Sequence, residues 1–402
     1  MRTHRRAGSP PHELAFADDA MNDGVPAYVS LLTPPGRGAL ATIGVRGPRA
    51  WQVTQACLEG SQPSATDHQR LRPRLRRLAN GSSAAEELVV VFENQNEARL
   101  HCHGGIAACD AVLQAHTKQG AVRVDWRHWN GAESASSTIR AARVALADAL
   151  TERAALILLD QLHGALEREF AAIAELLSQL ATHSNAQQRI EQLLTRAPLG
   201  LHLTQPWRVV IAGRPNAGKS SLLNALLGFQ RAITNEQPGT TRDVVTARTA
   251  FAGWPIELAD TAGLRTSSDP LEVAGIELAE HEVRQCDLVL YVIPADESAE
   301  EVDRQRTSLD LLRRQIPLLV VRSKADLSLS PQSKEQGLHV SARRGDGLAT
   351  LIDAVAQRLI GTAPAAGESV PFTLQQVDML QQTRAALLAG NVSSFQKQLV
   401  DQ

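Results

Sequence analysis

The sequence contains few aromatic residues, few cysteines and no long run of apolar residues. Aromatic side chains make up 3% of its 402 residues, and its 4 cysteines are scattered. So few cysteines exclude a disulfide scaffold or a zinc cluster and indicate thiols in a reducing compartment. A membrane span needs about 18 consecutive apolar residues, and a secretory signal needs an apolar N-terminal segment; neither pattern is present. These absences predict a cytoplasmic protein with no membrane segment.

The sequence also lacks a strong net charge. Its formal net charge is -2, so no global field draws it toward nucleic acid, and any RNA contact would be local. A run of arginines between Arg70 and Arg77 could line one face of a strand and contact RNA phosphates. A solvated surface is the more usual explanation of such a run.

The order of apolar runs, turns and helical patterns divides the chain into five segments. Apolar residues from Leu158 to Leu180 recur every three or four positions and predict helices with one buried face. Later, apolar strands alternate with helical patterns, which is typical of a doubly wound, mainly parallel α/β sheet. We expect the last helix to pack on the earlier helices, so that this α/β domain is inserted in an α-helical domain. The segments are a disordered tail (1–24), a small α+β domain (25–125), the first helical part (126–204), the α/β nucleotide domain (205–361) and the second helical part (362–402).

The strongest motif is a phosphate-binding loop at residues 213–220, Gly-Arg-Pro-Asn-Ala-Gly-Lys-Ser. It lies between an apolar strand and a helical pattern, which is the context that this P-loop motif requires. Its backbone N–H groups and the helix N-terminus favour phosphate, Lys219 reaches the β- and γ-phosphates, and the Ser220 hydroxyl is placed to hold Mg²⁺. We predict nucleotide contacts from Gly213, Asn216, Ala217, Gly218, Lys219, Ser220 and Ser221.

Two further motifs predict the Mg²⁺ and γ-phosphate contacts. Asp260-Thr-Ala-Gly263 follows an apolar strand, so Asp260 can hold the Mg²⁺ shell and the Gly263 N–H can sense the γ-phosphate. The run Gly-Thr-Thr-Arg-Asp lies between this motif and the loop. We predict that Thr241 completes the Mg²⁺ shell and that Thr240 also contacts the nucleotide.

A third set of residues predicts selection of guanine. Asp326, in Ser-Lys-Ala-Asp, can accept both N–H groups of the guanine N1/N2 edge, which adenine does not offer. Lys324 would cover the base with its alkyl chain. The residue usual at position 323 is Asn; Ser323 is shorter and forms fewer hydrogen bonds, which predicts weaker binding. The backbone of Ser341 and Ala342, on an expected last strand, would contact guanine O6.

The hydrolytic residues are less evident. Many GTPases have a Gln after the Asp-x-x-Gly glycine to orient the attacking water, whereas this chain has Leu264. Either hydrolysis is slow or another group aligns the water. Glu272 is a candidate, although its residue type alone favours a solvated helix charge. Asn216 could help to hold a monovalent cation beside the phosphates, where it would stabilise developing charge.

Five runs together resemble the MnmE (TrmE) family of tRNA-modification GTPases. Three lie in the nucleotide domain and two lie in the N-terminal domain. They are Gly213-Arg-Pro-Asn-Ala-Gly-Lys-Ser-Ser-Leu-Leu-Asn224, Pro238-Gly-Thr-Thr-Arg-Asp243, Asp260-Thr-Ala-Gly-Leu-Arg265, Thr33-Pro-Pro-Gly-Arg-Gly38 and Leu100-His-Cys-His-Gly-Gly105.

The resemblance implies a homodimer, formed through the N-terminal domain, whose nucleotide domains pair around K⁺ to activate GTP hydrolysis. By position it assigns K⁺ contacts to Asn216, Asn235, Gln237 and Thr240, and it makes Glu272 the water-orienting residue. It also implies a flavoprotein partner, with which the family builds an aminomethyl-type group on the wobble uridine of tRNA from a folate one-carbon unit.

Three departures from the family pattern lie in segments that the resemblance associates with folate and tRNA. No cysteine follows Cys286, and residues 92–97 and 124–131 replace family segments on either side of the His-Cys-His-Gly-Gly marker. These departures argue against a folate cofactor and leave two alternatives open. The departures favour a GTP-driven switch or assembly factor without tRNA chemistry. The other alternative is a GTP-binding scaffold that barely hydrolyses GTP, for which Ser323 and Leu264 are the only support.

Overall fold

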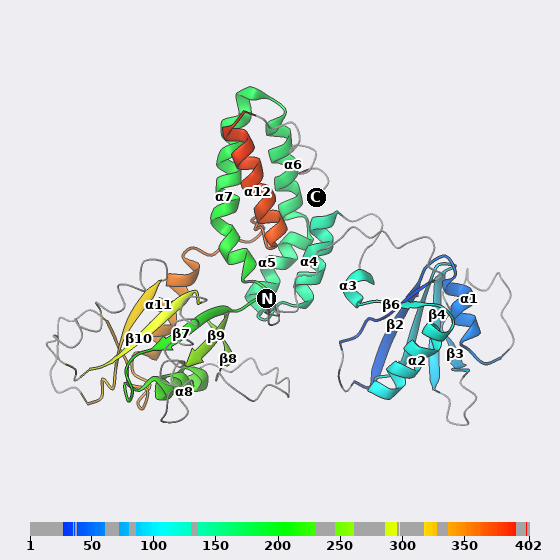
Figure 1. Ribbon diagram of the computed structural model, residues 1–402, viewed down its shortest axis with the longest axis horizontal. Helices are drawn as coiled ribbons and strands as arrows, with labels where there is room; N and C mark the ends of the chain where they lie inside the picture. The colour runs from blue at the N-terminus through cyan, green and yellow to red at the C-terminus, as the bar shows by residue number, and fades with distance from the viewer. Residues whose placement is uncertain are drawn as a thin grey trace, which may run out of the picture. The chain divides into compact units, whose positions relative to one another are not determined.

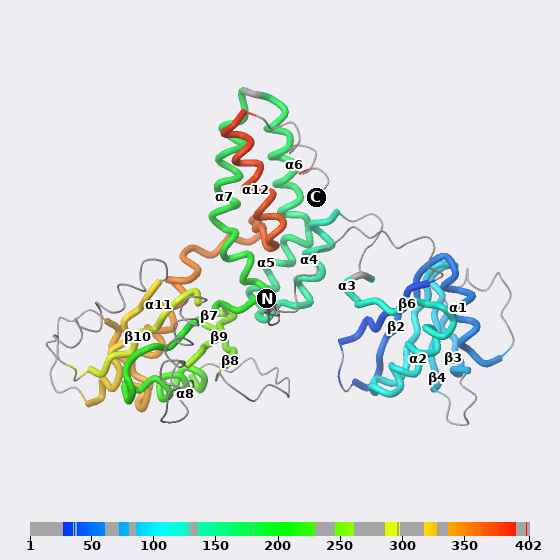
Figure 2. The backbone as a smooth tube through the Cα atoms, viewed as in Figure 1, coloured from blue at the N-terminus to red at the C-terminus, as the bar shows by residue number. Residues whose placement is uncertain are grey.

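The computed structural model describes most of the chain in two compact units, residues 1–133 and 134–402, drawn in Figure 1 and Figure 2. The described residues are 27–34, 36, 38–60, 72–79, 86–129, 136–229, 246–260, 286–295, 297, 317–327, 337–390 and 399.

The first unit contains a six-stranded sheet in the order β3-β4-β5-β2-β1-β6. Its pairs are antiparallel except for β1 and β6, which are parallel. Its strands are β1 (Tyr28–Leu31), β2 (Leu40–Arg46), β3 (Arg74–Arg77), β4 (Glu87–Asn94), β5 (Glu97–His103) and β6 (Val122–Arg123), and its helices are α1 (Ala50–Ala56), α2 (Ile106–Lys118) and α3 (Trp126–Trp129).

Alternation of apolar and polar residues sets the two faces of this sheet. Leu88, Val90 and Phe92 of β4 are buried and alternate with more exposed residues, as the two-residue period of a strand requires. Their face packs with α1 and α2 in one apolar core. On the opposite face a Cβ at Gly44 of β2 would collide with the Trp129 ring of α3, so this glycine lets the indole lie flat against the sheet.

Helices of the second unit form a bundle: α4 (Ser137–Ala147), α5 (Glu152–Leu162), α6 (Ala165–Leu177), α7 (His183–Leu201) and α12 (Leu374–Leu388), with a 3-10 turn at Leu180–Thr182. Figure 1 shows α12 beside α7, and α6 and α7 are also in contact. Leu158, Leu166 and Phe170 of the predicted apolar stripe lie in the bundle core. Gly164, in the left-handed conformation with φ 85°, divides this stripe between two helices.

Two helix boundaries follow from short-range chemistry, and one does not. The Thr373 hydroxyl accepts from the Gln376 N–H, and the Gln376 side chain accepts in return, which caps the start of α12. The Thr151 hydroxyl caps α5 in the same way through the Ala154 N–H. Helix α7, by contrast, passes through Pro198 to Leu201. Burial of residues on either side of the proline, such as Leu199, stabilises the helix although one N–H is missing.

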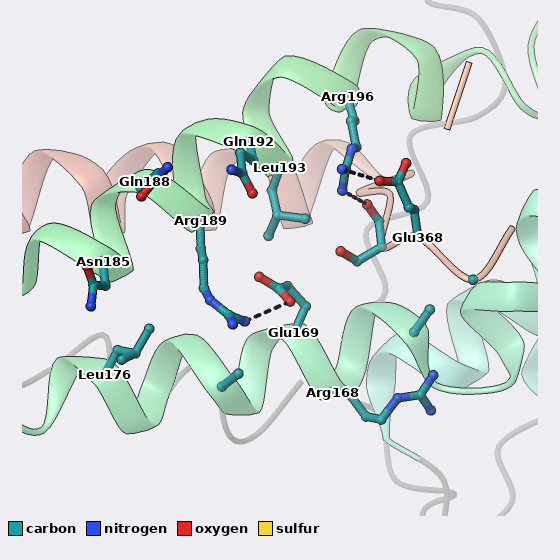
Figure 3. Close-up of a pocket in the computed structure, with 14 residues that line it drawn as sticks. Arg168, Glu169, Leu176, Asn185, Gln188, Arg189, Gln192, Leu193, Arg196 and Glu368 are labelled. Carbon is teal, nitrogen blue, oxygen red and sulfur yellow. Dashed lines mark hydrogen bonds and ion pairs between the residues drawn. The ribbon is translucent and has the colours of Figure 1, made fainter. Parts of the chain in front are cut away.

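A return segment, residues 367–371, leads back to α12 and is held between α5 and α7. The buried Gln161 amide donates to the Glu368 carbonyl over 3.0 Å and accepts from the Val370 N–H over 3.2 Å. Arg196 of α7 pairs with the Glu368 carboxylate at 2.7 Å, as Figure 3 shows. A Cβ on Gly200 would collide with the Pro371 carbonyl, so glycine permits the close approach of α7 to this segment.

The remaining strands of the second unit form a sheet in the order β12-β11-β10-β7-β9-β8. Every pair is parallel except β8 with β9. The elements are β7 (Trp207–Ala212), α8 (Lys219–Phe229), β8 (Thr246–Phe251), β9 (Trp254–Asp260), β10 (Leu288–Pro294), β11 (Leu318–Ser323), β12 (Leu338–His339) and α11 (Leu348–Ile360). The sheet is mainly parallel, as the alternation of strands and helices predicts. The last strand ends at His339, so Ser341 and Ala342, expected within it, lie in the following turn.

Candidate guanine-nucleotide site

The phosphate loop connects β7 to α8, because β7 ends at Ala212 and α8 begins at Lys219. A Cβ on Gly213 would collide with the Val292 carbonyl, so only glycine lets the start of the loop lie against β10. Gly218 and Asn216 have positive φ angles of 92° and 61°. Left-handed residues turn the loop backbone sharply, so that successive N–H groups can point into one concave site. The helix N-terminus behind them favours an anion.

Two polar side chains of α8 lie where the motif predicts phosphate and Mg²⁺. Lys219 is 6% exposed, and its Nζ donates to the Arg214 carbonyl over 2.8 Å. The Ser220 Oγ donates to Asp260 Oδ2 over 2.7 Å. Parallel pairing places Ile211 opposite Asp260, so the ends of β7 and β9 lie side by side. A hydroxyl and a carboxylate in contact are hard oxygen ligands, and they fit Mg²⁺ completed by phosphate oxygens and water.

The predicted base site adjoins the phosphate loop through Ser323. Its Oγ donates to the Ala217 carbonyl over 2.6 Å, and the Ile293 carbonyl lies 3.4 Å away. The contact with Ala217 joins the end of β11 to the phosphate loop across 106 positions of sequence. The sequence predicted that Ser323 weakens guanine binding. It did not predict a hydrogen bond from Ser323 to the phosphate loop.

Asp326 lies on the turn after β11 and is oriented by Ser341. The Ser341 hydroxyl, which is fully buried, donates to Asp326 Oδ1 over 2.8 Å and accepts from the Arg344 N–H over 3.1 Å. The hydrogen bond from Ser341 holds the pKa of the Asp326 carboxyl below its usual range. An ionised carboxylate is what two N–H donors of guanine require. Only the backbone of Ser341 was expected to take part in the site, so its side-chain contact is an addition.

The other predicted residues divide into two groups. Ser221 is exposed on the first turn of α8, Lys324 has a positive φ of 55° next to Ser323, and Ala342 follows Ser341. The remaining predicted site residues lie outside the described part of the chain. They are Asn235, Gln237, Thr240, Thr241, Gly263 and Glu272.

A cleft of about 800 Å³ lies elsewhere in the second unit, between α6, α7 and the return segment. Figure 3 shows Arg189 turned toward Glu169 and Arg196 toward Glu368. These pairs measure 3.1 and 2.7 Å, so the charges of this cleft are largely satisfied by one another. None of the predicted nucleotide-binding residues lines it.

Within the described ranges, no cluster of three or more His, Cys, Asp or Glu side chains could hold a metal ion. None of the described helices is long and apolar enough to cross a bilayer. In the first unit, the His-Cys-His marker is tied to neighbouring residues: His101 Nδ1 lies 3.0 Å from the Thr42 hydroxyl, and His103 Nδ1 lies 2.7 Å from Glu86.

Both units match known families. Residues 208–324 match the family described as 50S ribosome-binding GTPase, and residues 27–154 match the N-terminus of the GTP-binding protein TrmE. The chain is 34% identical to the tRNA modification GTPase MnmE of Methylorubrum populi over 83% of its own length and 82% of that protein. The chain belongs to the MnmE family. It is 32% identical to the MnmE of Pectobacterium carotovorum over 84% of its length and 83% of the relative.

Membership of the MnmE family makes the protein a GTPase, as the phosphate loop indicates. Solved structures share only part of the chain. The Aquifex aeolicus Era variant bound to GDP and AlF4⁻ is 26% identical, covers 42% of this chain and 60% of its own, and has a TM-score of 0.29. The G domain of the Thermotoga maritima FeoB iron transporter is 22% identical, covers 38% of this chain and 99% of its own, and also has a TM-score of 0.29. Likeness at these TM-scores supports no further conclusion about the MnmE-family chain.

Proposed function

We propose that this MnmE-family protein is a homodimeric, K⁺-stimulated GTPase that acts in the modification of wobble uridine in tRNA. The observation that carries the proposal is the joining of the two halves of the predicted site by Ser323, which bonds the strand end beside Asp326 to the phosphate loop. The phosphate half holds Lys219, Ser220 and Asp260, and the base half holds Asp326 and Ser341.

In the phosphate half, the loop N–H groups and the Lys219 ammonium bind the β- and γ-phosphates. Ser220 and Asp260 are the residues that would hold Mg²⁺, and Thr241 would complete its ligands. Bound Mg²⁺ supplies charge neutralisation on the phosphates. Support comes from the contact of 2.7 Å between Ser220 and Asp260, which already brings the two oxygen donors together. Thr240 and Gly263 complete the proposed nucleotide contacts.

In the base half, Asp326 accepts the two N–H groups of guanine, and Ser341 keeps its carboxylate ionised and oriented. The backbone N–H of Ala342 donates to guanine O6, and the alkyl chain of Lys324 covers the base. This assignment predicts strong selection against adenine, which has no hydrogen on N1, no amino group at C2 and an N–H₂ donor in the place of O6.

For hydrolysis, we assign the orientation of the attacking water to Glu272, because Leu264 at the usual position can neither donate nor accept a hydrogen bond. Asn216, Asn235, Gln237 and Thr240 are the proposed K⁺ contacts. Support for Asn216 is its exposed, left-handed position in the phosphate loop. A cation there would stabilise charge that develops on the phosphates.

Outside the nucleotide site, we propose dimerisation through the N-terminal domain, a cytoplasmic location and insertion of the nucleotide domain in the helical domain. The contact of α12 with α7 supports the insertion. The family name favours tRNA as a partner. The resemblance adds a flavoprotein partner and a folate one-carbon donor, of which the folate donor is the one that the departures from the family pattern argue against. The departures at residues 92–97 and 124–131 favour a second candidate, a GTP-driven switch or assembly factor. Normal wobble-uridine modification in a deletion strain would favour that second candidate.

Steady-state GTP hydrolysis in KCl and in NaCl, at equal ionic strength, tests the first proposal. We expect clearly faster hydrolysis in KCl, and a loss of this difference in Asn216→Ala. Asn224→Ala, on the exposed side of α8, is the matched control and should keep the response to K⁺. Equal, near-zero rates in both salts with tight GTP binding would contradict the hydrolytic proposal.

A further inference from the structure

Ser323 lies where β11 meets the phosphate loop, and its hydroxyl hydrogen is engaged there. The Oγ donates to the Ala217 carbonyl over 2.6 Å, and the Ile293 carbonyl is a second acceptor at 3.4 Å. The residue is 5% exposed. A Cβ built on Gly218 would lie 3.6 Å from the same Oγ, an ordinary van der Waals distance, so the hydroxyl lies beside the loop.

The number of hydrogens on this side chain limits what it can contact. A serine hydroxyl has one hydrogen to donate, whereas the amide of asparagine, the usual residue here, has two. Asparagine could donate to the Ala217 carbonyl and to a nucleotide acceptor at the same time. Once Ser323 has donated to Ala217, it can only accept.

The nearest expected nucleotide atom is itself an acceptor. Asp326 is assigned to the N1/N2 edge of guanine, so the opposite, five-membered ring of the purine faces the phosphate loop and Ser323. Its N7 carries no hydrogen and only accepts. Two acceptors do not form a hydrogen bond. Rotation of the Ser323 hydroxyl toward N7 would leave the buried Ala217 carbonyl without this donor, and an unmade buried bond costs more than an average bond contributes.

We propose that this protein recognises guanine without a hydrogen bond to N7, and that Ser323 is a positioning residue that braces the phosphate loop. Guanine is then selected through Asp326 and O6 alone. The inference rests on the proposed guanine-nucleotide site.

The test compares GDP with 7-deaza-GDP, in which a C–H group replaces N7, by calorimetry in Mg²⁺ at fixed salt. For the unaltered protein we expect the two dissociation constants to agree within about twofold, since no bond to N7 is lost. Ser323→Ala should weaken both nucleotides by the same factor, about fivefold, because only the brace is removed. Ser323→Asn should bind GDP about fivefold more tightly than 7-deaza-GDP, because its second amide hydrogen reaches N7.

Two results would overturn the inference alone. The first is that the unaltered protein binds 7-deaza-GDP fivefold or more weakly and that Ser323→Ala abolishes the difference, which would mean that Ser323 donates to N7. The second is an unchanged affinity of Ser323→Ala for both nucleotides, which would exclude a brace. Melting curves check that each variant is folded. If Ser323→Asn does not fold, the unaltered protein and Ser323→Ala still test whether Ser323 donates to N7. Failure of the unaltered protein to bind either nucleotide would instead overturn the nucleotide site itself.

Discussion

The two six-stranded sheets of this protein place their motif residues in opposite ways. In the parallel sheet, β7, β9 and β11 all end at one edge, so the phosphate loop, Asp260 and Ser323 meet there although they are distant in sequence. In the antiparallel sheet, the His-Cys-His marker forms the last three residues of β5, and successive side chains point to opposite faces. Cys102 is buried in the core, whereas His101 and His103 contact Thr42 and Glu86.

This difference between the sheets determines whether the order of motifs along a chain can locate a site. Parallel strands with crossover connections bring strand ends together, so ordered motifs predict a single site. Antiparallel strands bring residues together by register, which the order of motifs does not specify. The ordered motifs of the second unit therefore predict a single site, while the marker of the first unit indicates a family and no particular chemistry.

The largest expected effect is the loss of Lys219. Lys219→Ala should reduce the rate of GTP hydrolysis by about 100- to 1000-fold, since a buried cation at the phosphates is removed. Lys118→Ala removes an exposed lysine at the end of α2 in the first unit; it is the control and should leave the rate unchanged. Hydrolysis within a fewfold of normal in Lys219→Ala would break the comparison, because the phosphate loop would then not be the reactive edge.

A smaller effect is expected for Asp326→Asn. The neutral amide cannot accept both guanine N–H groups, so the affinity for GDP should fall on the order of 30-fold. The amide N–H₂ can instead donate to the 2-oxo group of xanthine, so xanthosine diphosphate should bind this variant better than GDP. Competition binding with the two nucleotides measures both changes. An unchanged preference for guanine would place base recognition elsewhere.

In the first unit, Gly104→Ala tests whether a glycine of the His-Cys-His-Gly-Gly marker is needed for packing. The new Cβ would collide with the Gly38 carbonyl, so we expect this unit to lose about 1–3 kcal/mol of unfolding free energy. Gly105→Ala is the matched neighbour, with no atom within 4 Å of its Cβ and a φ of -77°. Thermal unfolding followed by tryptophan fluorescence distinguishes them. GDP affinity should remain normal in both variants, and its loss in Gly104→Ala would show that the two sheets are coupled.

The smallest effect is expected for Ser341→Ala, and it depends on pH. Ser341 lowers the pKa of Asp326, and nucleotide binding needs the ionised carboxylate. Removal of the hydroxyl raises this pKa, so binding is lost at a higher pH as the solution is acidified. The ratio of the GDP dissociation constants, variant over unaltered protein, should be a fewfold near pH 7.5 and should increase toward about pH 4. A ratio that stays constant with pH would mean that Ser341 does not act through Asp326.

The sequence predicted the parts of this molecule that depend on local pattern. The phosphate loop, the strand that ends at Asp260 and the buried stripe of the bundle follow from spacing and residue type. The left-handed turn at Gly164, which divides the stripe, was not predicted, because a glycine within an apolar period does not by itself end a helix.

Contacts between distant residues could not be predicted from these patterns. The bond from Ser323 to Ala217 spans 106 positions, and the pair of Arg196 with Glu368 spans 172. Neither leaves a periodic signal. Helix α7 also continues through Pro198, because the packing of the neighbouring residues in the bundle outweighs the local preference of proline to end a helix.

The close approach of Gly200 to Pro371 affects the conformational entropy of the chain between them. These two residues close a loop that contains the whole parallel sheet, roughly 170 residues. Loop-closure entropy grows only with the logarithm of length, at about 0.6 kcal/mol for each doubling. A loop of 170 residues therefore costs only about 2.5 kcal/mol more to close than one of ten. The return of the chain to the bundle after so long a segment therefore adds little to the entropic cost of folding, provided that the segment folds on its own core.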